Sequence, residues 1–291
     1  MKSLVLFMYT ESPLHAGTGS SVSTVDLPIQ RERATQFPIV QGSGVKGALR
    51  SQAKDESKVS EVFGPETNTA SDHAGAISVG EARIVLFPVR SLVGVFAYVT
   101  SPLALARLGR DLKAAQINNL PDLNFPDLKD SEALLSGNGV DAGGSVVLEE
   151  FAFSAKTDPK LSKAAQWLAE NAFPSDSVYQ YWREKVKSSL VLLPDNAFRD
   201  FVLNSTEITT HVKIKIETKT VQDGALWTSE SLPPDALLSS HVVARKPRAP
   251  KSTLGDADKI AGWLMENLSG YLQLGGDETT GQGVVALQWV K

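Results

Sequence analysis

The sequence predicts an α+β protein built on a ferredoxin-like βαββαβ unit that is enlarged by insertions. From the N-terminus to Leu112, apolar strand-like runs and helical runs follow in the order strand, helix, strand, strand, helix, which is most of such a unit. Later stretches rich in Pro, Gly and Asn interrupt the pattern, as insertions do. A chain of 291 residues is long enough for one large domain, so we expect residues 1–291 to form a single domain.

The first elements are predicted from three adjoining segments. An almost unbroken apolar run at Ser3–Thr10 predicts a buried strand. Residues 11–36 are polar and rich in Gly and Ser, and a loop of this length within a compact domain usually carries function. A helix is expected over about 45–53, with Ser43 or Gly44 near its N-cap.

Two strands and a helix are expected next. The strands, Ala76–Phe87 and Leu92–Thr100, should be separated at Pro88, which cannot donate to a sheet. Ser101 followed by Pro102 is typical of an N-cap and first helical residue, so a helix should extend to about Leu112.

The rest of the chain is predicted to hold insertions and the closing strands. Insertions are expected at about 54–76, which is polar and should be a flexible loop, at about 114–144 and at about 156–204. The other expected elements are a strand at Val146–Ala155, helices at 158–171, 176–187 and 195–203, a half-exposed strand at Glu207–Glu217, a hairpin within about 217–236 with Asp223 and Gly224 at its tip, a strand at Leu237–Ala244, an extended basic linker at 245–251, a helix at Asp256–Leu268 and a strand at Val284–Val290.

Composition excludes several classes of chemistry. The chain is 42% hydrophobic and 21% charged, which is ordinary for a globular protein. It has no cysteine, so disulfides, cysteine-ligated zinc, thiol catalysis and iron–sulfur clusters are excluded. The sequence shows neither a membrane-span pattern nor a signal-peptide pattern, so we expect a cytoplasmic protein with no membrane partner.

The charge is unevenly distributed. A formal net charge of −4 argues against a protein that coats nucleic acid over its whole surface. Residues 1–54 nevertheless carry six Lys/Arg against three Asp/Glu, and residues 211–251 carry seven against four. Local potential at a groove matters more for binding than the total charge. The counts favour a narrow basic track, and ordinary scatter of charges is the alternative.

Residues 42–50 read G-S-G-V-K-G-A-L-R, a small-residue turn that opens a helix. A helix N-terminus offers free N–H groups and the positive end of the helix dipole. Gly42 and Gly44 would let a phosphate come close, Ser43 could donate a hydrogen bond, and Lys46 would add a charge. The segment therefore predicts a phosphate-binding site, with a plain helix start and a solvated lysine as the alternative. It lacks the P-loop pattern, so nucleotide hydrolysis is not expected.

Five segments, in order along the chain, carry recognisable motifs. They read H-A-G-T-G at 15–19, V-D-L-P-I-Q-R-E-R at 25–33, G-S-G-V-K-G-A-L-R at 42–50, E-T-K-T-V-Q-D-G-A-L-W-T-S-E-S-L-P-P at 217–234 and L-Q-L-G-G-D-E-T-T-G-Q-G at 272–283. Together they resemble the RAMP superfamily of CRISPR effector proteins, and within it the backbone subunit, the fourth, of the type III-B (Cmr) RNA-targeting complex.

The resemblance implies a fold and a function. It implies an RRM-like core with insertions, copies of which assemble with other Cmr subunits into a filament along CRISPR guide RNA. Each copy would act as an endoribonuclease that cuts the paired target RNA, and the 217–236 hairpin would be a thumb that displaces one base pair. Two alternatives remain: a structural RNA-binding filament subunit without catalysis, and the related type III-A backbone subunit.

The resemblance also implies a cleavage site at Asp26. Cleavage in the family is ascribed to attack by a ribose 2′-OH on the adjacent phosphate. Asp26 could hold a divalent ion, Mg²⁺ or Mn²⁺, or help to deprotonate the hydroxyl; because an ordinary Asp with a pKa of about 3.9 is a poor base, the metal role is favoured. Loop capping is the alternative for Asp26. His15 could donate a proton, bind RNA or be structural, and Glu230 could supply a second carboxylate.

Further RNA contacts are implied around these residues. Arg50 lies on the face of Lys46, one helical turn on, and Arg31 and Arg33 would extend the track, unless Arg31 and Glu32 form a surface ion pair.

The glycine-rich loop and the hairpin complete the predicted site. The loop's glycines suit close approach to RNA or a tight turn, and they are Gly275, Gly276, Gly281 and Gly283. Leu226 and Trp227 would fill the stacking space that a displaced base leaves, at about 1–3 kcal/mol per base, unless Trp227 is a core aromatic.

Overall fold

The computed structural model describes residues 1–22, 24–250 and 252–291. Its elements up to the middle of the chain are β1 (Lys2–Thr10), β2 (Ile39–Val40), α1 (Gly42–Gln52), α2 (Glu56–Phe63), the 3₁₀ turn η1 (Thr67–Thr69), β3 (Ile77–Val79), β4 (Ala82–Arg90), β5 (Phe96–Thr100), α3 (Pro102–Ala114), β6 (Glu132–Leu135) and β7 (Ser145–Leu148).

The second half continues with β8 (Phe151–Thr157), α4 (Pro159–Asn171), η2 (Ser177–Tyr179), α5 (Gln180–Ser189), β9 (Leu190–Leu192), α6 (Asp195–Asn204), β10 (Glu207–Ile214), β11 (Val221–Ser231), β12 (Leu237–Ala244), α7 (Ala257–Asn267), β13 (Gly270–Gln273), η3 (Glu278–Thr280) and β14 (Val284–Val290).

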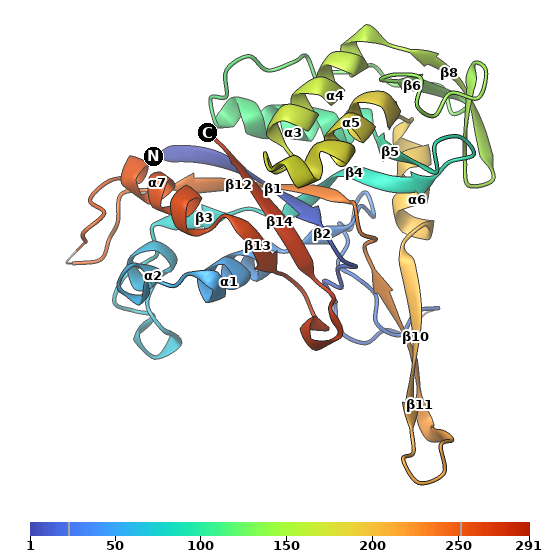
Figure 1. Ribbon diagram of the computed structural model, residues 1–291. Helices are drawn as coiled ribbons and strands as arrows, with labels where there is room; N and C mark the ends of the chain where they lie inside the picture. Colours follow the sequence, from blue (N-terminus) through green and yellow to red (C-terminus); the bar gives the residue numbers. More distant parts are fainter. Residues whose placement is uncertain (23, 251) are drawn as a thin grey trace.

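A large, mostly antiparallel sheet organises the molecule, and helices lie against it (Figure 1). Its strand order is β13-β14-β1-β12-β4-β5-β9-β6-β8-β7, with β2 and β3 joined to β4 and β12. Two neighbour pairs, β5 with β9 and β6 with β8, are parallel. A separate two-stranded hairpin, β10–β11, projects away from the sheet (Figure 1). The predicted α+β class is therefore confirmed.

β1 lies between β12 and β14 and divides the core into two layers. Side chains alternate across a strand, so the apolar run of β1 feeds both faces. Leu4, Leu6 and Met8 pack in the cluster that includes α1 and α7 residues, such as Leu49 and Leu264. The odd-numbered residues of β1, Val5, Phe7 and Tyr9, pack in the cluster built from α3, α4 and α5. Helices thus cover both faces of the sheet.

The strand beside β1 differs from the one that local sequence suggests. In a βαββαβ unit the third strand pairs with the first. Here β5 pairs with β4 and β9, and the strand antiparallel to β1 is β12, with Leu6 opposite Ser240. Assigning Leu92–Thr100 and the helix after it to that unit was therefore wrong. The pairing joins segments more than 200 residues apart, which no local pattern can show.

Three local predictions were wrong. Residues 54–76 contain the helix α2, whose N-cap Asp55 accepts a hydrogen bond from Ser57 N at 3.1 Å. Pro88 does not separate two strands: it lies inside β4 opposite Tyr98, and the break in 76–87 comes before Ala82. The strand expected at 146–155 is the hairpin β7–β8, turned at Glu149 with φ of 50°.

The projecting hairpin is also longer than predicted. β10 and β11 pair from Glu207 with Ser231 to Ile214 with Val221, so the turn lies at 215–220. Asp223 and Gly224, expected at the tip, lie within β11. The segment 207–217, predicted as a separate strand, is thus the first arm of the same hairpin.

Several helices agree with their predicted positions. α3 begins after Ser101, whose hydroxyl accepts from Ala104 N at 3.3 Å, and α4, α5, α6 and α7 lie where helices were expected. The segment 245–250 forms neither helix nor strand, and Lys251 of the predicted linker lies outside the described residues.

Among the described residues, no helix combines the length and apolar character that crossing a bilayer requires.

Candidate functional site

The loop after β1 lies along the base of the β10–β11 hairpin. Backbone bridges connect Leu14 with Leu232 and Leu27 with Ser229. Leu27 N donates to Thr228 O at 3.0 Å, and Glu230 N donates to Leu27 O at 2.9 Å. The parts of the loop around Leu14 and Leu27 are thus held against the base of the hairpin by backbone hydrogen bonds.

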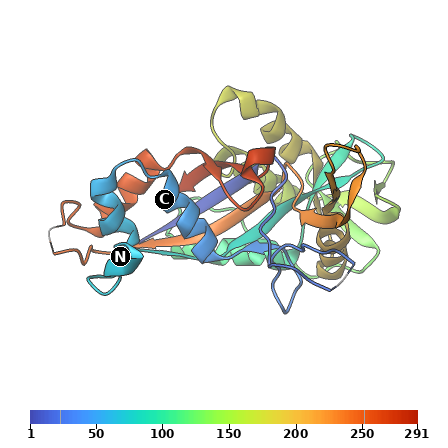
Figure 2. The same cartoon turned by 90° about the horizontal axis from the view of Figure 1, so that it is seen from below.

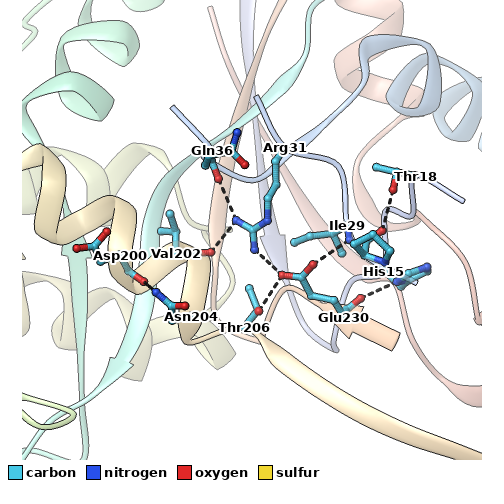
Figure 3. Close-up of polar contacts among 11 residues, drawn as sticks. His15, Thr18, Ile29, Arg31, Gln36, Asp200, Val202, Asn204, Thr206 and Glu230 are labelled. Carbon is cyan, nitrogen blue, oxygen red and sulfur yellow. Dashed lines mark hydrogen bonds and ion pairs between the residues drawn. The ribbon is translucent and has the colours of Figure 1, made fainter. Parts of the chain in front are cut away.

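Glu230 lies at the centre of this junction, where its carboxylate makes three hydrogen bonds (Figure 3). Glu230 is buried, with 6% of its surface exposed, and its carboxylate forms an ion pair with the Arg31 guanidinium. It also accepts from Ile29 N at 3.0 Å and from Thr206 Oγ1 at 2.9 Å. A buried carboxylate needs such a set of partners, because burial without them is costly. Glu230 therefore ties the loop, β11 and the start of β10 together.

Arg31 makes three hydrogen bonds in this junction. Besides Glu230, its Nη1 donates to the carbonyls of Gln36 and Val202, both at 2.9 Å (Figure 3). The surface pair considered between Arg31 and Glu32 does not form: Glu32 instead pairs with Arg107 at 2.8 Å and Arg83 at 3.5 Å. The guanidinium expected on an open phosphate track thus lies in a structural network.

Asp26 lies exposed at the edge of the same junction. Its Oδ2 accepts from Thr228 N at 2.8 Å and from Thr228 Oγ1 at 2.9 Å. These hydrogen bonds, the backbone one first, hold the pKa of Asp26 below its ordinary value. Both bonds reach Oδ2, and among the residues that the structure describes Oδ1 accepts no hydrogen bond. The carboxylate is oriented, charged at neutral pH and open to solvent.

His15 lies between the hairpin and the glycine-rich loop. Its Nδ1 lies 2.6 Å from Glu230 O, and a carbonyl can only accept, so Nδ1 carries the proton (Figure 3). In the neutral ring, Nε2 is then the unprotonated nitrogen. Gly17 lies against it: a Cβ at Gly17 would come 2.6 Å from Nε2. This loop position therefore requires glycine in order to keep the imidazole in place.

α1 starts at Gly42, two residues earlier than Gly44 and one earlier than Ser43, the expected caps. Gln41 occupies the N-cap and makes no side-chain hydrogen bond to the first turn within the described chain. The N–H groups of that turn therefore stay open to a ligand. Gly42 has a packing role as well, because a Cβ there would lie 2.3 Å from Val79 O.

Lys46 and Arg50 differ in what holds them. Lys46 is half-buried, and its ammonium has no hydrogen bond or ion pair within the described residues. Burial, and then the charge of Arg50, lower its pKa from the ordinary value. Arg50 donates to Gly64 O at 2.6 Å and pairs with Glu66 at 2.7 Å. The Lys46 ammonium therefore has no compensating anion among the described residues, whereas the Arg50 guanidinium is already bound to Gly64 O and Glu66.

The glycine-rich loop packs directly on the His15 segment. Gly276 N donates to His15 O at 2.9 Å, and Gly283 N donates to Pro13 O at 2.8 Å. Gly275, with φ of 82°, allows no side chain, since a Cβ would lie 2.5 Å from His15 O. Gly281 also has positive φ but faces open space. Tight packing therefore accounts for Gly275 and Gly283.

A groove of about 880 Å³ joins three of the predicted segments. It is lined by His15 and Gly17, by Gly44 and neighbouring residues of α1, and by the glycine-rich loop. Gln30, which the sequence did not single out, links these parts: its Oε1 accepts from Gln41 N at 2.8 Å and its Nε2 donates to Gly17 O at 3.1 Å. The folded chain thus brings together segments separated by about 260 positions.

The hairpin carries the predicted stacking residues on its surface. Leu226 is 64% exposed and Trp227 is 37% exposed, so the core alternative for Trp227 was wrong. The Trp227 ring stacks on His211, with 5.3 Å between centroids and 13° between planes. Arg33 is exposed as well, in the loop before β2.

A metal centre made of protein groups is absent from the described residues. No cluster of three His, Cys, Asp or Glu side chains is found there. Within the described part of the chain, Asp26 offers a metal one carboxylate oxygen that accepts no hydrogen bond. A single carboxylate oxygen suits only an ion that takes most of its ligands from water and phosphate, and Mg²⁺ usually binds in this way.

The candidate site thus combines a glycine-lined groove with an exposed, oriented carboxylate in the loop after β1, on an α+β scaffold. The chain belongs to the RAMP superfamily, whose sequence model matches residues 7–286. It is 41% identical over 291 aligned residues to the "CRISPR system Cmr endoribonuclease Cmr4" of Pyrococcus furiosus, covering 98% of this chain and 95% of that relative.

Comparison with solved structures finds the same fold in Cmr proteins. Oligomeric Cmr4 from Pyrococcus furiosus matches with a TM-score of 0.75 and 35% identity, over 99% of this chain and 98% of that one. A chain of the type III-B Cmr-beta complex bound to cognate target RNA matches with a TM-score of 0.73 and 22% identity, over 99% and 97%. The second likeness shows the shared fold alone.

Replacing Glu230 by Ala should destabilise the protein strongly. The variant leaves the buried Arg31 guanidinium without its carboxylate, which costs about 3–5 kcal/mol. Urea unfolding measures the free energy. Glu184→Ala, which removes an exposed carboxylate paired with Lys187, is the matched control and should change stability by about 0.5 kcal/mol or less. Equal losses in both variants would contradict the structural role of Glu230.

Replacing Thr228 by Val should raise the pKa of Asp26 toward its ordinary value, because one of two hydrogen bonds to Oδ2 is lost. Carboxyl ¹³C NMR titration measures this, with Thr209→Val on the same hairpin as the control. Since the folded pKa is lowered, the contact stabilises the fold above the unfolded pKa and is lost as pH falls through the folded value. An unchanged pKa would show that Thr228 does not orient Asp26.

Proposed function

We propose that this chain is the backbone subunit of a type III-B CRISPR effector, which assembles on guide RNA and cuts complementary target RNA. The identity to a relative named as a Cmr endoribonuclease, over nearly the whole of both chains, supports the activity. The likeness to a Cmr4 that was solved in oligomeric form supports self-assembly. The single observation that carries the proposal is the exposed, oriented Asp26 at the base of the projecting hairpin.

We also propose a ferredoxin-like, RRM-like core within the single domain. It consists of β1, α1, β4, β12, α7 and β14, in which the first strand lies between the third and the fourth. Both helices of this unit pack with the even-numbered residues of β1, as such a unit requires. The stretch between β4 and β12 is then the main insertion, and it includes the hairpin, to which we assign the thumb role.

The guide backbone is assigned to the groove at the start of α1. Open N–H groups of the first turn favour a phosphate there, and Lys46, which has no partner within the described residues, adds a positive charge in that same turn. Gly44 lines the groove and the glycine-rich loop forms the opposite wall, while Ser43 lies exposed in the first turn of α1. Arg33 and the outer Gly281 extend the track in this proposal, whereas Arg31, Arg50, Gly275 and Gly283 act by holding the walls in place.

We propose that the target strand is cut when a ribose 2′-OH attacks the adjacent phosphate and the 5′-oxygen of the next nucleotide leaves. The hairpin would displace a base with Leu226 and Trp227, freeing the backbone to align the oxygen, phosphorus and leaving oxygen. The lowered pKa makes Asp26 a weak proton acceptor, so its part is that of a fixed negative charge. The unprotonated Nε2 of His15, at the groove wall, is the group that could take a proton, which the resulting imidazolium could then give up.

A divalent ion, Mg²⁺ or Mn²⁺, would be held by Asp26 Oδ1 together with water and RNA. Bound there, it would neutralise charge that develops on the phosphate. Glu230, the second carboxylate considered, is committed to Arg31, Ile29 and Thr206, and we assign it a structural role.

Asp26→Asn should abolish target cleavage and leave guide binding nearly unchanged. The amide keeps the size of the side chain but removes its charge. Cleavage of a labelled target by the assembled complex is measured with Mg²⁺, with Mn²⁺ and with EDTA, beside Asp258→Asn as an exposed control. Retained cutting by Asp26→Asn would favour the alternative, a structural filament subunit whose nuclease lies elsewhere.

Lys46→Ala should weaken guide binding for any sequence. One lost phosphate contact lowers the slope of log affinity against log salt by about one unit. Fluorescence anisotropy across a salt series measures the slope, and Lys113→Ala, at the exposed end of α3, is the control. A slope equal to that of the unsubstituted protein would remove Lys46 from the phosphate track.

A further inference from the structure

A second groove, of about 830 Å³, lies away from the α1 groove, between α6 and the β7–β8 hairpin. Its wall is aromatic: Phe151 is 61% exposed and meets Phe201 edge to face, with 5.9 Å between ring centroids. Exposure of a large aromatic side chain at a groove is typical of a binding surface.

The rim of this groove is acidic. Carboxylates of four residues border it: Asp130, Glu149, Glu150 and Asp200. Two guanidiniums balance them in part, since Arg90 contacts Glu149 and Glu150 at 2.9 and 3.2 Å, and Arg199 contacts Asp200 at 2.9 Å. The rim keeps a net negative charge. It would repel RNA and attract a cationic segment.

The chain itself carries a segment of matching chemistry at 245–250, R-K-P-R-A-P. The side chains of Arg245, Lys246 and Arg248 are exposed and have no hydrogen bond or ion pair within the described residues. Pro247 and Pro250 restrict its backbone, which runs without helix or strand to Arg248 and then bends at Ala249 and Pro250.

Both ends of this segment are anchored. Arg245 N donates to Ala76 O at 2.8 Å. On the other side, the buried Glu61 accepts from Thr253 N at 3.1 Å and Leu254 N at 3.0 Å. The segment is therefore presented as a strap with fixed ends, which lowers the cost of ordering it on binding.

We propose that the strap 245–250 of one copy docks in the Phe151 groove of the next. The strap lies at one end of the molecule, beside α7, and α6 with the β7–β8 hairpin lies at the other end, in both Figure 1 and Figure 2. One chain cannot join them, whereas a row of copies can. A contact between two different surfaces is head-to-tail and open-ended, so it builds a row. This inference rests on the self-assembly in the proposed function and names its surfaces.

Cross-linking tests the contact, and the absence of cysteine makes it clean. Ala249→Cys and Asn196→Cys, on the strap and at the groove, are purified separately, mixed without RNA and treated with a short bismaleimide. A heterodimer should form, and a chain with both cysteines should give a ladder of higher oligomers. Val178→Cys, 64% exposed on another surface, replaces Asn196→Cys in the control mixture. A heterodimer yield equal to this control would overturn the proposal.

Charge reversal separates docking from random collision. Arg248→Glu in the strap chain should lower the heterodimer yield about threefold to fivefold, and so should added salt. Glu150→Arg in the groove chain should restore the yield with Arg248→Glu. Heterodimer yields that stay the same in Arg248→Glu and in the pair Arg248→Glu with Glu150→Arg would overturn the proposed contact. So would variants that lose the cross-link yet assemble on guide RNA and cut normally, a result that leaves the proposed function standing. Loss of guide affinity in Arg248→Glu without any cross-link would assign the strap to RNA instead.

Discussion

The buried ion pair between Glu230 and Arg31 is the interaction on which the candidate site depends. The Glu230 carboxylate is held by a guanidinium, a backbone N–H and a hydroxyl, from the loop after β1 and the start of β10. Burying that charge is tolerable only because every partner is present. The pair therefore fixes one arrangement of the loop on the hairpin, and both Asp26 and His15 take their places from it.

Side chains at the base of β11 have different roles on the two faces of the strand. Thr228 and Glu230 point to the loop, where one orients Asp26 and the other pins Arg31. Trp227 and Ser229 point the other way, where both contact His211. Because side chains alternate along a strand, four consecutive residues serve the loop and the exposed aromatic surface together. Any shift of register by one residue would exchange these roles.

Local patterns predicted some elements well and could not predict others. The apolar run of β1, the Ser101 cap and the helices α4 to α7 follow from propensity and periodicity. The pairing of β1 with β12, the hairpin turn at 215–220 and the partners of Arg31 depend on contacts between distant segments. At the site, the motif residues Asp26, Lys46 and His15 were recognisable from sequence. Thr228 and Gln30 were not, because a threonine in a strand or a glutamine in a loop carries no signal until its partner is known.

Helices on both sides of the sheet have a consequence for how the protein can diverge. In many four-stranded RNA-binding modules, aromatic side chains on the open sheet stack with bases. Here α3, α4 and α5 fill that face with apolar packing. In the proposed function, recognition lies instead in loops and a hairpin, which tolerate insertion and exchange better than a packed strand does. The scaffold can stay constant while the length and chemistry of its contacts change from one lineage to another.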